Sequence, residues 1–153
     1  MNGNGERTNG ISYLRVRFSM ITAAFGLLIF IIGAKPSWLG WDRTVVVGFT
    51  QIVVFLIGLA LICFGGFVGL SALWGREERS IIADIGLRLV GTGYVITVFT
   101  GLADIFGMGS QPLPKLPYFG PWQAGGVVVG QIVIAIGFLM VIPYRFYFSR
   151  IHR

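Results

Sequence analysis

Residues 44–74 (TVVVGFTQIVVFLIGLALICFGGFVGLSALW) contain no charged side chain. A helix needs about 20 apolar residues to cross about 30 Å of hydrocarbon, and this stretch is longer. In lipid, the backbone amides of a spanning segment must be hydrogen-bonded internally, which makes such a stretch helical. The stretch therefore predicts a transmembrane helix and an integral membrane protein.

Further apolar stretches flank this one, so the sequence predicts an all-α fold, a four-helix transmembrane bundle. The chain has 153 residues, of which only 12% are charged, about half the share of a soluble domain. The first apolar stretch follows a basic segment as in a secretory signal, but it is too long for one, so we expect a retained signal anchor. The expected segments are a disordered basic tail at 1–17, a membrane domain at 18–148 with helices at about 18–34, 44–74, 81–108 and 122–148, and a basic tail at 149–153.

The basic residues are divided unequally between the two sides of such a bundle. Cytoplasmic loops are enriched in Lys and Arg, which predicts that both termini are cytoplasmic, in a plasma (inner) membrane. Beside the last span, Arg145, Arg150 and Arg153 favour contact with anionic lipids, and the scattered charges do not favour nucleic acid. One side carries Arg7, Arg15, Arg17, Arg76, Arg79, Arg145, Arg150 and Arg153, and the other carries Lys35, Arg43 and Lys115.

Residue types that carry chemistry are scarce. Cys63 is the only cysteine and His152 the only histidine, which argues against zinc sites and Cys–His catalysis. The sequence contains no P-loop, dinucleotide-binding turn, nucleophile elbow or HExxH motif. We therefore expect no enzymatic activity, no cofactor and no metal.

Small residues recur every seven positions in each expected helix. This spacing keeps one face toward a neighbouring helix and implies a left-handed, close-packed bundle, because small residues let membrane helices approach closely. We call these positions, together with the neighbouring glycine of each of two GxxxG pairs, the seam. The glycines through which the seam is expected to pack are Gly26, Gly33, Gly58, Gly65, Gly69, Gly86, Gly93, Gly107, Gly126, Gly130 and Gly137.

Short matches between the two halves of the chain favour two tandem two-helix repeats. Leu14-Arg15 matches Leu87-Arg88, and Gln51-Ile52-Val53 matches Gln131-Ile132-Val133. Tandem two-span repeats would be related by an axis along the membrane normal. Coincidence among Ile, Val and Gly is the alternative explanation.

Charged residues within the apolar stretches occur only in the third of them, since Arg145 follows the last stretch. Asp84 and Arg88 are four residues apart, which predicts an ion pair at the membrane interface. Asp104 shares the seam face, which predicts a polar cluster that serves either as a transport site or as hydrogen-bonding between helices. The expected members of this cluster are Asp104, Thr100, Thr97, Gln51 and Gln131.

Together these features favour a non-enzymatic accessory or scaffold subunit of a membrane complex. Its expected partners are the lipid bilayer and either another membrane protein or a second copy of the chain. The alternative is a small dimeric transporter or channel that uses the polar cluster around Asp104.

Overall fold

The computed structural model describes residues 5–35, 49–74, 79–108 and 120–142, and within them it is built of helices. The helices are α1 (Gly5–Ala34), α2 (Phe49–Leu73), α3 (Ile81–Gly101) and α4 (Pro121–Val141). All four are long and apolar enough to span a membrane. The predicted four-helix transmembrane bundle is confirmed.

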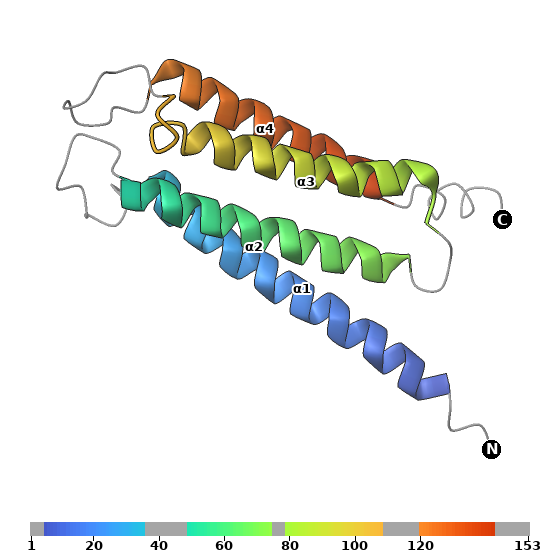
Figure 1. Cartoon of the computed structure of the whole chain (residues 1–153). Coiled ribbons are helices and arrows are strands. Elements are labelled where there is room, and N and C mark those ends of the chain that lie inside the picture. Colours follow the sequence, from blue (N-terminus) through green and yellow to red (C-terminus); the bar gives the residue numbers. More distant parts are fainter. Residues whose placement is uncertain (1–4, 36–48, 75–78, 109–119, 143–153) are drawn as a thin grey trace.

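The helices pack in two antiparallel pairs (Figure 1). α1 packs on α2, and α3 packs on α4, whereas contacts between the two pairs are fewer. We call these pairs the first and the second hairpin. The start of α1 and the end of α4 lie at the same end of the bundle, which we call the terminal end, and the opposite end we call the distal end.

Local sequence explains where the second hairpin's helices begin and end. Ser80 caps α3, because its hydroxyl accepts a hydrogen bond of 3.1 Å from the Ile82 amide. α4 begins at Pro121, which needs no amide partner in the first turn. It ends at Val141 because Ile142 precedes a proline and adopts an extended conformation (ψ 128°).

The first helix begins earlier than expected. We expected a disordered tail at 1–17, but α1 already starts at Gly5. No proline interrupts residues 5–34, and extending a helix that the membrane already stabilises requires no new nucleation step. Three other expected segments lie outside the described residues. They are the beginning of the second expected helix (44–48), the end of the fourth (143–148) and the basic tail (149–153) with its arginines.

The third helix ends earlier than expected, at Gly101 rather than Met108. Successive turns follow it, with hydrogen bonds from Ile105 N to Leu102 O (2.9 Å) and from Met108 N to Ala103 O (3.0 Å). Gly107 has a φ of 72°, in the left-handed region that favours glycine. A Cβ on Gly107 would have no neighbour within 4 Å, so the expectation that Gly107 packs in the seam is wrong.

The other seam glycines lie at close contacts between helices, which are contacts with backbone atoms except at Gly69 and Gly126, where side chains of Ser19 and Thr100 are the neighbours. A methyl group built on Gly93 would lie 2.6 Å from Gly130 O and 2.8 Å from the amide nitrogen of Ile134. In the first hairpin, a methyl group on Gly26 would lie 3.0 Å from Gly58 O. Both hairpins are therefore close-packed through glycine. In α4 the buried residues are Gln123, Val127, Gly130, Ile134, Gly137 and Val141, alternating by four and three residues as in left-handed helix pairs.

The two hairpins use the same packing scheme. Gly58 of α2 meets Gly26 of α1, as Gly130 of α4 meets Gly93 of α3. Seven residues before these two α2 and α4 glycines stand Gln51 and Gln123. The structure thus makes Gln123, and not Gln131, the counterpart of Gln51 in the second hairpin.

The hairpins meet through a small apolar cluster with a few polar contacts. Leu59, Val90 and Ile134 form its buried centre. Hydrogen bonds also join the hairpins, from the Trp74 indole to Val141 O at 3.0 Å and from the Tyr94 hydroxyl to Leu56 O at 3.4 Å. The remaining members packed on the cluster are Phe30, Cys63, Tyr94 and Phe138.

Candidate functional site

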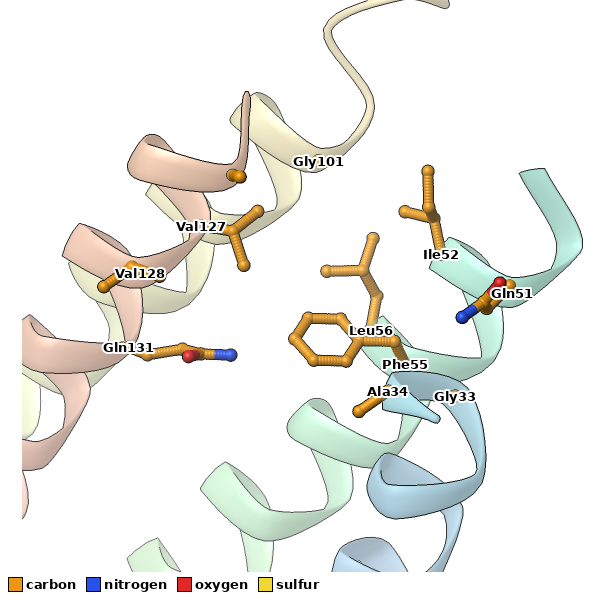
Figure 2. A pocket seen from close by; sticks show the side chains of 11 residues that line it. Gly33, Ala34, Gln51, Ile52, Phe55, Leu56, Gly101, Val127, Val128 and Gln131 are labelled. Atoms are coloured by element: carbon orange, nitrogen blue, oxygen red, sulfur yellow. The ribbon is translucent and has the colours of Figure 1, made fainter. Parts of the chain in front are cut away.

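A pocket of about 270 Å³ lies between the two hairpins toward the distal end (Figure 2). The end of α1 and the start of α2 form one wall, and the end of α3 and the first half of α4 form the other. Among the described residues that line it, none carries a charged side chain. Those residues are Gly33, Ala34, Gln51, Ile52, Phe55, Leu56, Gly101, Ala124, Val127, Val128 and Gln131.

Gln51 and Gln131 supply the polar side chains of this pocket. They come from opposite hairpins, and both are half-buried. In Figure 2 the Gln131 amide is directed toward the opposite wall, and Gln51 stands on that wall near Ile52 and Phe55. Neither forms a hydrogen bond with another residue in the described part of the chain. The structure therefore brings these two members of the expected polar cluster to one cavity.

The two threonines of the expected cluster lie elsewhere. Thr97 is fully buried between α3 and α4, and its hydroxyl donates to Gly93 O at 2.9 Å. The Thr100 hydroxyl donates to Ile96 O at 2.8 Å, and its side chain faces Gly126. Both hydroxyls are thus satisfied within α3 and fill the seam of the second hairpin.

Asp104 is separate from both groups. It is half-buried in the turns that follow α3, beyond the helix end at Gly101. Its carbonyl accepts a hydrogen bond from the Gly107 amide at 3.2 Å, and it does not line the pocket. The structure does not assemble the expected cluster around Asp104.

The predicted ion pair of α3 is present on the outer surface of the helix. Arg88 Nη2 lies 2.9 Å from Asp84 Oδ2, and the two side chains are 81% and 52% exposed. Gly91 and Thr92 continue the same exposed side, and nothing lies within 4 Å of a Cβ built on Gly91. We call Asp84, Arg88, Gly91 and Thr92 the polar face of α3.

The sequence analysis did not foresee the role of Gln123. Its Oε1 accepts a hydrogen bond of 2.8 Å from the Gly120 amide and so caps α4, while its Nε2 is buried without a partner among the described residues. A Gln three residues after a Gly-Pro start is a recognisable capping signal, because the third helical residue can reach back to the N-cap amide.

Neither metal-binding side chains nor comparison with known proteins assigns a function to this site. In the described segments, no group of His, Cys, Asp and Glu side chains is placed to hold a metal ion. No protein-family model, no curated protein and no solved structure matches this chain.

Proposed function

We propose that this chain is a non-enzymatic accessory or scaffold subunit, which holds a transmembrane helix of a partner protein against the polar face of α3. The observation that supports this is the exposure of Asp84, Arg88, Gly91 and Thr92 on a helix that is long enough to span the membrane. α3 is also the least apolar of the four spans.

A polar, small-residue face is a poor surface for lipid and a good one for another helix. Charged side chains in a span are costly in hydrocarbon, although Arg88 can extend its guanidinium toward the headgroups. Gly91 leaves a groove in which a neighbouring backbone can approach closely. α4 occupies the opposite side of α3, through Gly86, Gly93 and Thr97, so the polar face is available to a partner.

The position of the arginines supports the proposed location, a plasma (inner) membrane with both termini in the cytoplasm. The first half of α1, which includes Arg15 and Arg17, and the residues just before α3, which include Arg79, lie at the terminal end of the bundle. Basic residues near the ends of spans favour the cytoplasmic side, and with this orientation the pocket would lie in the outer half of the bilayer.

Photo-crosslinking tests the scaffold proposal. We expect a benzoylphenylalanine at Thr92 to form one dominant crosslink to another membrane protein in cells, and the same residue at lipid-facing Val129 to form none. Gly91→Leu should abolish that crosslink, because its side chain fills the groove. Gly125→Leu is the matched control, since Gly125 also has an open surrounding. Equal crosslinking from Thr92 and Val129 would contradict the proposal.

The alternative of a transporter has less support, because Asp104, the threonines and the glutamines lie in separate places. We expect proteoliposomes of the purified chain, loaded with a pH-sensitive dye, to conduct protons no faster than protein-free vesicles. Asp104→Asn should leave this rate unchanged, because Asp104 does not reach the pocket. Proton flux that the substitution lowers several-fold would favour the transporter instead.

A further inference from the structure

The pocket between the hairpins has properties of a binding site that the scaffold proposal does not use. Ligand sites in helix bundles lie between helices and combine apolar walls with a few polar groups, with volumes from about 300 Å³ upward. At about 270 Å³ this pocket is slightly smaller than that range. It is too narrow for a partner helix, which is about 10 Å across, but it can take a single slender chain.

The two amides indicate what the chain must carry. A polar group held in an apolar environment without a hydrogen bond costs several kcal/mol in hydrocarbon-like reference states. Gln51 and Gln131 both line the pocket, and neither side chain has a hydrogen-bond partner among the described residues. A ligand with carbonyl or hydroxyl groups would satisfy them, and the described lining residues, none of them charged, disfavour an ionised group in the pocket.

The depth of the two amides agrees with a chain that enters from the distal end. Gln51 lies in the first turn of α2. Gln131 lies ten residues after Pro121, in the middle of α4, and the pocket lining extends from there to Ala124 and Ile52 nearer the distal end. Beside the pocket, the Tyr94 hydroxyl donates to the carbonyl oxygen of the lining residue Leu56 at 3.4 Å and joins the two hairpins.

We propose that this pocket binds one apolar chain of an uncharged amphiphile, with its carbonyl or hydroxyl groups hydrogen-bonded by Gln51 and Gln131. Such a chain can come from a free single-chain lipid or from the acyl chain of a bilayer phospholipid. The binding does not depend on the partner helix, since the polar face of α3 is a separate surface.

Photolabelling of the full-length chain in nanodiscs tests this proposal. One probe is a monoacylglycerol with a diazirine in its chain, and the other is a phosphatidylcholine with the same acyl group; labelled residues are located by mass spectrometry. We expect saturable labelling at pocket residues such as Ile52, Ala124 and Val128. If unlabelled monoacylglycerol reduces labelling by the phospholipid probe, the ligand is a free single-chain lipid. If it does not, the bound chain comes from a phospholipid of the bilayer.

Two neighbouring valines provide the matched variants. Val128 and Val129 are 51% and 53% exposed, but only Val128 lines the pocket. We expect Val128→Trp to reduce pocket labelling to background and Val129→Trp to leave it unchanged. Gln131→Leu is a second test in case Val128→Trp does not fold, because it leaves the pocket open. It should weaken monoacylglycerol binding about three-fold, which corresponds to the loss of one average hydrogen bond in a membrane. Labelling that is not saturable, or that persists in Val128→Trp, would overturn the proposal.

Discussion

Gly93→Ala is expected to lower the free energy of unfolding by about 1–3 kcal/mol, the usual cost of inserting a methyl group into a packed interior. The added Cβ would meet backbone atoms of α4, Gly130 O at 2.6 Å and Ile134 N at 2.8 Å. Backbone atoms cannot rotate away, so α3 and α4 must separate along their length. In lipid, that separation removes the packing that holds the pair together.

Two further glycines turn this prediction into a graded series. Gly126→Ala should cost less, because its Cβ would meet only side-chain atoms of Thr100. Gly91→Ala should have no cost or should stabilise by up to about 1 kcal/mol, the advantage of alanine in a helix, since nothing lies within 4 Å. Unfolding by sodium dodecyl sulfate in mixed micelles, followed by tryptophan fluorescence, measures all three. A loss in Gly91→Ala equal to that in Gly93→Ala would refute the packing explanation.

The helices and their contact faces could be predicted from sequence because two simple constraints act on them. Hydrocarbon thickness sets the length of each apolar stretch, and close approach requires small residues at a fixed spacing, as at Gly58 and Gly130. The same spacing fails at Gly107, because a repeat can be continued in sequence past the residue where the helix ends. Helix ends depend on turn geometry that hydropathy does not encode.

The pocket could not be predicted from sequence. Helical periodicity shows on which face of its own helix a residue lies, but not which other helix packs against that face. Thr97 and Asp104 share a face by periodicity, yet Thr97 packs against α4 and Asp104 lies in the following turns. The cluster where the hairpins meet, including Leu59 and Ile134, uses the same residue types as the lipid-facing surfaces. Which apolar residues touch another helix and which touch lipid is therefore not visible in composition.

The sparse contact between the hairpins leads to the second prediction, that Trp74→Ala separates them while each hairpin stays folded. The Trp74 indole is buried and donates to Val141 O at 3.0 Å. Replacing it removes the ring and leaves a buried carbonyl without its partner, and the unsatisfied carbonyl alone costs about 1–3 kcal/mol. Because the seams lie within the hairpins, their packing does not depend on Trp74.

Distance measurements between the hairpins can separate the two contributions of Trp74. Spin labels at exposed Phe64 of α2 and Ile136 of α4, in a Cys63→Ala background, should give a narrow distance distribution by electron–electron double resonance. We expect Trp74→Ala to broaden and lengthen it, and Trp74→Phe, which keeps an aromatic ring but no N–H donor, to have an intermediate effect. Equal effects of both variants would assign the contact to the hydrogen bond. An unchanged distribution in Trp74→Ala would show that the apolar cluster around Leu59 joins the hairpins without it.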